Sequence, residues 1–174
     1  TPTFVARDVR FGNAPWGSDP TMFAADRVAV RLSLSSLLSG NISVTRLDVR
    51  GATLLLETGP EGKGNWVLDG LASDGEPSDT EMQTSTAGLP RVILEDVHVT
   101  YKSGRRGDVT DVDLTRADIE PRGEGIAIGL FGDLDSNPAS ASALIIGDER
   151  SFRVDDLKLA YGDIELTGTL SGSR

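Results

Sequence analysis

The chain has 174 residues, no cysteine and a formal net charge of −10. The lack of cysteine excludes a disulfide framework, a thiolate metal site and a cysteine nucleophile, and no apolar run reaches the roughly 18 residues of a membrane-spanning helix. The acidic balance argues against DNA, RNA and anionic headgroups as ligands, because clustered lysines and arginines bind these and the sequence shows no basic stripe.

Four segments repeat one pattern of apolar residues at alternate positions, then two polar residues, then apolar alternation again. They are residues 4–11, 42–49, 92–99 and 152–159. Such alternation is typical of a strand with one buried face, and the extra polar residue shifts its phase once, as a β-bulge or bend does. A glycine follows each segment, at Gly12, Gly51, Gly104 and Gly162. Each unit is therefore expected to be a bent hairpin.

The first half of the chain is expected to contain strands at residues 4–11, 27–34, 42–49, 53–57 and around 66–68. A serine N-cap, the Leu37–Leu38 pair and Gly40 as terminator predict a short helix over 35–39.

Residues 70–88 contain no valine, isoleucine or aromatic residue and predict a flexible acidic loop. Strand-like alternation resumes at 91–101, 109–120, 124–134, 140–146, 152–161 and 163–170. The whole pattern favours one mostly β domain over residues 1–174, an elongated antiparallel sheet of repeated bent hairpins with one short helix.

The candidates for chemistry favour structural interpretations, so the chain is not expected to be an enzyme, nor to hold a cofactor or a metal. His98 lies between Val97 and Val99 and is expected to face solvent, because alternation points it away from the apolar set. Residues 133–137 are similar to the start of a calcium loop, but Pro138 and Leu144 replace its glycine and its glutamate, so a turn is the better interpretation.

Residues 27–66 resemble the N-terminal signature of the AsmA family. The signature comprises a strand, a Leu-Leu-x-Gly turn ending at Gly40, an Ile-x-Val-x-x-Leu strand over 42–47, a leucine-rich strand ending at Glu57, and a Gly-x-x-Asn-Trp element over 62–66. Ala52 departs from the proline that family members often carry after the glycine. In the later repeats the similarity lies mostly in periodicity.

The resemblance implies a curled, taco-like antiparallel sheet, as in the related TamB and bridge-like lipid-transfer proteins, whose apolar β groove carries lipid chains. It also implies a Gram-negative envelope protein linked to outer-membrane biogenesis, lipid homeostasis and lipid transport. Since the chain begins at Thr1 without an initiator methionine, it is expected to be a periplasmic excerpt of a longer, inner-membrane-anchored protein. The implied partners are phospholipid or another lipid and envelope proteins, with no nucleic acid and with membrane contact through segments outside this chain.

An acyl chain suits an apolar sheet face without a helix layer, because each buried methylene contributes about 0.8 kcal/mol and needs no directional contact. The outer face should then carry the charged residues, which keep the chain off anionic membranes. The residues expected to bind lipid are Val28, Val30, Leu32, Val44, Leu47, Val49, Val97, Val99, Tyr101, Leu157, Leu159 and Tyr161.

Two alternatives stay open. The predicted lining residues can instead pack on one another in a closed β-sandwich or barrel. The function can instead be that of a protein-interaction scaffold, which assists outer-membrane protein assembly through strand addition at an exposed edge.

Overall fold

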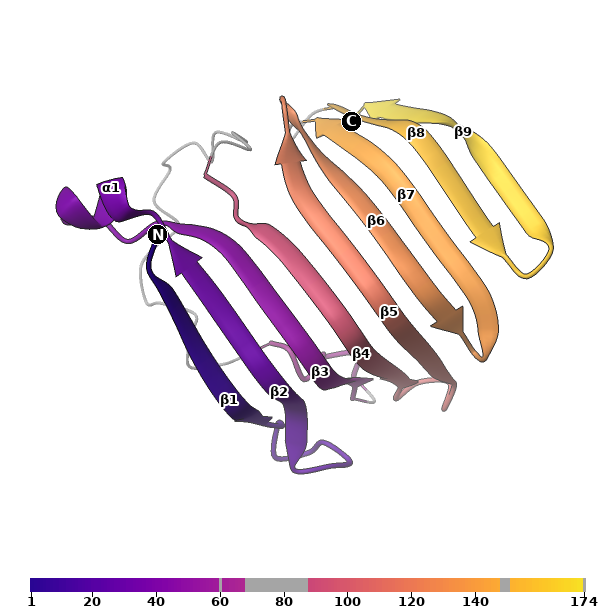
Figure 1. The fold of residues 1–174 in the computed structure, drawn as a ribbon. Coiled ribbons are helices and arrows are strands. Elements are labelled where there is room, and N and C mark those ends of the chain that lie inside the picture. The colour runs from indigo at the N-terminus through magenta and orange to yellow at the C-terminus, as the bar shows by residue number, and fades with distance from the viewer. Residues whose placement is uncertain (60, 68–87, 148–150, 174) are drawn as a thin grey trace.

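The computed structural model describes residues 1–59, 61–67, 88–147 and 151–173, most of which lie in strands (Figure 1). Strands account for 72% of the described residues. The elements in chain order are β1 (Thr3–Gly12), β2 (Thr21–Leu32), α1 (Leu34–Leu38), β3 (Val44–Thr58), β4 (Arg91–Ser103), β5 (Val109–Arg122), β6 (Gly125–Leu134), β7 (Asn137–Gly147), β8 (Ser151–Tyr161) and β9 (Ile164–Ser173).

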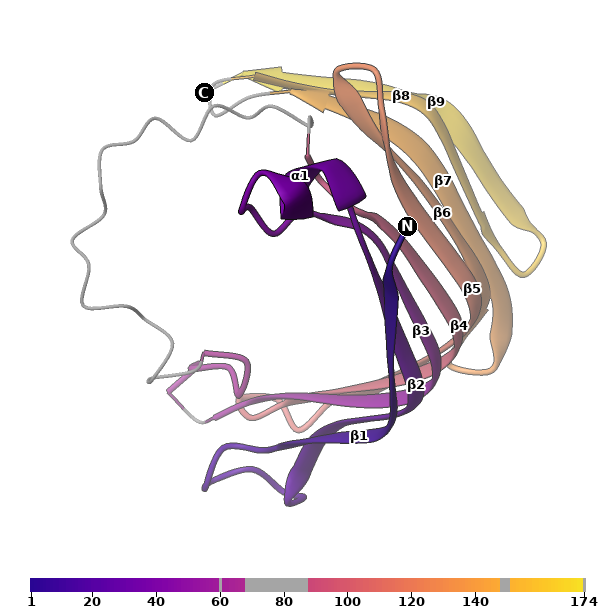
Figure 2. The ribbon, with the colours of Figure 1, turned by 60° about the vertical axis from the view of Figure 1, so that its left-hand side comes forward.

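The described strands form one nine-stranded sheet in which the spatial order follows the chain order from β1 to β9. The predicted mostly β, curled sheet is confirmed, and the sheet stays open between its edge strands β1 and β9, so the closed sandwich or barrel is excluded (Figures 1 and 2). Neighbouring strands are antiparallel, except that β3 and β4 run parallel. That pair differs from the antiparallel expectation.

Each predicted repeat contains an irregularity at its polar pair. Asp8, Asp96 and Asp156 adopt positive φ values of 51°, 55° and 52° at the second polar position of their repeats. In the repeat at 42–49 the register instead skips Thr45, since Arg31 pairs with Arg46 and Leu32 with Val44. The strands bend part-way along their length, and together they curl the sheet into a trough (Figure 2).

The turn expected at Gly51 is wrong, because β3 runs through this glycine without a break. Gly51 has a φ of 60°, and a Cβ atom there would clash with Oδ2 of Asp26 on β2. Strand β3 therefore bends at Gly51. Asp26 on β2 and Asp96 on β4 lie beside it, and the cross-strand pairing skips all three residues. Gly12 does end β1, and Gly104 and Gly162 do lie in the turns after β4 and β8.

Three boundaries also differ from prediction. Strand β2 begins at Thr21 rather than residue 27. The prediction missed residues 21–26 because they do not alternate between apolar and polar. The strand expected around 66–68 is absent at residues 66–67, since Trp66 lies in a turn and Gly64 forms an isolated bridge to Thr58, and residue 68 lies outside the described part. Helix α1 starts one residue early behind the N-cap Ser33, and Gly40 follows it with a φ of 79°. Of the predicted loop at 70–88, residues 70–87 lie outside the described part.

The buried core lies at the bend of the central strands. Ala25, Val49, Ala52 and Val97 are buried there, and larger apolar residues pack around them. The core therefore lies on β2, β3 and β4 beside their bends and does not fill the trough.

Candidate functional site

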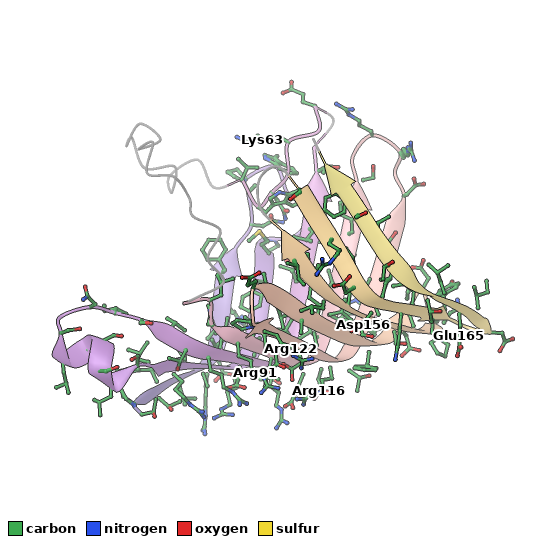
Figure 3. All side chains as sticks on the ribbon, turned by 90° about the horizontal axis from the view of Figure 1, so that it is seen from above. Lys63, Arg91, Arg116, Arg122, Asp156 and Glu165 are labelled. Atoms are coloured by element: carbon green, nitrogen blue, oxygen red, sulfur yellow. The ribbon has the colours of Figure 1, made fainter. Side chains whose placement is uncertain are left out.

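The concave face of the sheet is a continuous apolar surface built by cross-strand register. One row begins with Val28 opposite Val49 and Val49 opposite Leu94. It continues without a polar side chain through Ala117, Leu130, Ala141, Leu159 and Leu166. Arg91, Arg116 and Arg122 project from the opposite, convex side (Figure 3). The alternation predicted from the sequence thus separates an apolar inside from a charged outside.

The concave face over β5–β9 contains a hollow of about 590 Å³ whose lining is almost entirely apolar. A volume of this size lies within the range of roughly 300–1,000 Å³ found for ligand-binding cavities. Leu159, Ile164 and Leu166 line it and are 39%, 70% and 55% exposed. No described element covers these side chains, so the face presents apolar surface that a ligand can occupy.

The register and the alternation place all the predicted lining residues on this face, but in different environments. Val49 and Val97 are buried in the core at the bend, and Val28, Leu47 and Val99 pack against it. Tyr101, Leu159 and Tyr161 are exposed. Residues of the first group shape the trough, whereas those of the second are accessible to a ligand.

The prediction missed most of the hollow. Its further apolar lining includes Val112, Leu114, Leu130, Leu134, Ile164 and Leu166. Their alternation within 109–120, 124–134 and 163–170 was the available signal. What the sequence did not reveal is the register that places them beside Leu159 and Tyr161.

A buried polar network lies where β3 ends. The Asn65 side chain accepts a hydrogen bond from the backbone N–H of Glu57 (2.9 Å) and donates to the Leu55 carbonyl (2.8 Å) and to Oδ1 of Asn13 (2.9 Å). Asn65 and Glu57 are 1% and 5% exposed. The network ties the loop after β1 to β3 and to the turn at 62–66, which gives the signature residues Glu57 and Asn65 a structural role.

The Glu57 side chain remains charged in this buried position. Burial alone would raise its pKa, but hydrogen bonds from Ser18 and Asn13 and the nearby Lys102 ammonium outweigh it and lower the pKa below 4.5. Oε2 of Glu57 accepts from the Ser18 backbone N–H at 2.9 Å and from Nδ2 of Asn13 at 3.0 Å. The charge therefore holds the loop after β1 in place.

The convex face carries a network of ion pairs over β3–β5. Arg91 lies 2.6 Å from Asp118, Arg116 lies 3.0 Å from Glu95, and Arg46 lies 2.7 Å from Asp48. The hydrogen bond from Arg91 lowers the pKa of Asp118, against the smaller effect of burial. These pairs are partly exposed and each contributes little to stability.

His98 lies on the convex face, as expected, within a small polar cluster. Its Nδ1 is 2.6 Å from Oδ1 of Asp113, and its Nε2 is 3.1 Å from Oγ1 of Thr100. The Thr100 hydroxyl donates to Asp111 at 2.7 Å, so its proton is directed away from the imidazole. The cluster therefore lacks the nucleophile–base hydrogen bond that a catalytic triad requires.

The described residues contain no group of three or more His, Cys, Asp or Glu side chains arranged to hold a metal ion. Among them, no helix combines the length and the apolar character needed to cross a membrane. Asp135 and Ser136, with φ values of 48° and 65°, form the tight turn between β6 and β7, where the sequence was similar to a calcium loop.

A family model described as the AsmA family matches residues 1–168, which include all the strands that form the trough up to the middle of β9. No curated protein matches the chain.

Proposed function

The chain belongs to the AsmA family, and from this premise we propose that it binds the acyl chains of phospholipids along its apolar concave face. Membership of the family suggests a role in envelope and outer-membrane biogenesis. The proposed contribution to that role is to shield lipid chains from water, or to conduct them, in lipid transport and lipid homeostasis.

The exposed apolar hollow over β5–β9 is the observation that carries this proposal. Its rim residues Ile164 and Leu166 are more than half exposed, at 70% and 55%. Each methylene that leaves water on such a surface contributes about 0.8 kcal/mol, and the contact needs no polar partner. A phosphate headgroup can stay in water at the open rim of the trough while its acyl chain lies on the sheet.

We further propose that the protein acts without catalysing a reaction, in the periplasm, anchored to the inner membrane through segments outside this chain. The proposed partners are phospholipid or another lipid and envelope proteins, and nucleic acid is not among them. The polar clusters at His98 and at Glu57 support the proposed lack of catalysis, because hydrogen bonds within the fold account for both.

The test is mass spectrometry of solvent extracts from the purified protein. Leu159→Asp/Leu166→Asp places two charges in the hollow, and Lys158→Asp/Thr167→Asp makes the same substitutions at the neighbouring positions of β8 and β9. We expect phospholipid with the wild type and with the Lys158/Thr167 variant, and none with the Leu159/Leu166 variant at an unchanged circular dichroism spectrum. Lipid-free wild type, or equal lipid in both folded variants, would refute the proposal.

The edges of the sheet favour a second candidate, an interaction scaffold for outer-membrane protein assembly. Among the described strands, β1 and β9 each pair with one neighbour only. The β9 segment Ile164–Ser173 carries a single charged residue, Glu165, and so lacks the charges that protect many edge strands. Strand addition at β9 would occupy backbone groups and leave the hollow free, so lipid content separates the two functions.

A further inference from the structure

Arginines from separate strands line up across the convex face. Arg7 lies opposite Arg27, and Arg27 lies opposite Arg50. Like charges directly opposite each other destabilise a sheet. Such a row is unexpected in a chain with a net charge of −10. Because the row forms only through strand pairing, it corrects the expectation that the chain has no basic stripe.

A second row runs parallel to the first, nearer to α1. Arg31 lies opposite Arg46, and Arg46 lies opposite Arg91. Neighbouring strands are about 4.8 Å apart, so each row of three spans roughly 10 Å. The two rows together form what we term the arginine face, over β1–β4.

Half of this face is not neutralised. Arg46, Arg50 and Arg91 pair with acidic side chains. The remaining members, Arg7, Arg27 and Arg31, are exposed and form no ion pair within the described residues, and the same holds for Arg10 beside them. Strands β1 and β2 therefore carry these four unpaired arginines against two acidic residues, Asp8 and Asp26, and have an excess of positive charge.

Some acidic side chains of the second half lie away from this part of the sheet, since Asp111 lies opposite Thr100 and Asp113 lies opposite His98. Asp118 and Glu120 instead lie beside Arg91. A negatively charged surface would therefore be attracted to β1 and β2, where the unpaired arginines lie.

Exposed apolar side chains stand next to the arginine face. Helix α1 joins β2 to β3 directly beyond Arg31 and Arg46. Leu34, Leu38 and Ile42 in this connection are 53%, 82% and 80% exposed. An apolar tip beside a cationic surface is the combination found in proteins that lie on membranes.

We propose that the arginine face and the α1 tip dock on the surface of a bilayer that contains anionic phospholipids. Guanidinium groups bind phosphate in a bidentate manner, and headgroups supply phosphates across the whole surface. The apolar tip decides between this and an acidic protein partner, because a bilayer accepts leucine and isoleucine below its headgroups. The inference goes beyond the proposed function and does not depend on lipid in the trough.

The test is flotation of the purified chain with vesicles of phosphatidylglycerol and phosphatidylethanolamine, compared with vesicles of phosphatidylcholine. Arg27→Gln/Arg31→Gln removes two unpaired charges, and Arg105→Gln/Arg106→Gln makes the same change in the turn after β4, at the far end. Leu38→Gln/Ile42→Gln removes the apolar tip. Circular dichroism and thermal unfolding confirm that each variant folds.

We expect wild-type binding to the anionic vesicles only, weakened by salt. The Arg27/Arg31 variant should bind about thirtyfold more weakly, the Leu38/Ile42 variant should also lose binding, and the Arg105/Arg106 variant should bind like the wild type. No wild-type binding, or equal losses in the two arginine variants, overturns the proposal. Loss with the Arg27/Arg31 variant but not with the Leu38/Ile42 variant also overturns it, and then points to an acidic protein. The Leu159→Asp/Leu166→Asp variant should bind the vesicles like the wild type. A failure of the lipid-groove proposal would therefore change the lipid content of the protein and leave vesicle binding unchanged.

Discussion

At the scale of single residues, the curvature depends on a few backbone positions that most amino acids avoid. Asp8, Asp96 and Asp156 occupy the left-handed region, which aspartate tolerates better than bulkier residues do. Gly51 fills the same role in β3, and the carboxylate of Asp26 fills the space beside it. The repeated polar pair is therefore a signal for bending.

We expect Gly51→Ala to destabilise the protein by about 1–2 kcal/mol, because alanine is strained at a φ of 60° and its Cβ would displace the Asp26 carboxylate. Gly168→Ala on β9 is the control, since a Cβ there meets no atom within 4 Å. Urea unfolding monitored by circular dichroism measures both. A loss at residue 168 as large as that at residue 51 would contradict the explanation.

The Glu57 carboxylate predicts a pH dependence of stability. Its pKa is lower in the folded chain than its ordinary value of 4.5, so its stabilising effect is complete above that pH and is lost as the pH falls through the folded pKa. We expect the free energy of unfolding to drop less between about pH 6 and about pH 3 in Glu57→Gln than in the wild type. Equal drops in the two proteins would show that Glu57 is not the responsible group. Asp118, whose pKa is also lowered, should preserve part of the dependence in both proteins.

At the scale of elements, alternation predicts which residues form strands but not how the strands pair. Most strands were expected, including β4 to β9, because each shows one apolar side. The parallel pairing of β3 with β4 was not expected, since alternation fixes the face of a side chain and is indifferent to strand direction. The arginine face and most of the hollow were missed for the same reason, because both depend on register.

The uneven core predicts uneven stability among the strands. The described buried apolar residues are Ala25, Ala29, Val49, Ala52, Ile93, Val97 and Ala117, all on β2–β5. We expect hydrogen–deuterium exchange to be slowest in these strands and fastest in β9, because few buried contacts oppose its opening. Uniform protection across the sheet, measured by mass spectrometry of peptides, would contradict this assignment of the core.

At the scale of the whole molecule, the trough leaves apolar surface uncovered that other folds bury. A ligand that binds only the folded trough should therefore stabilise it. We expect lysophospholipid below its micellar concentration, at roughly 100 times its dissociation constant, to raise the Tm by roughly 5–10 °C. The Leu159→Asp/Leu166→Asp variant should show no such shift. A similar rise in both proteins would indicate binding elsewhere.

The open sheet also bears on growth by duplication. Register irregularities recur on both halves of the sheet, between Arg31 and Leu32, between Leu114 and Arg116, and between Val154 and Leu157. Because the bend is a property of each strand, copying a hairpin adds length to the trough and leaves its cross-section as it was. Evolution can thus set the reach of such a molecule by the number of hairpins alone, with no redesign of its apolar concave face.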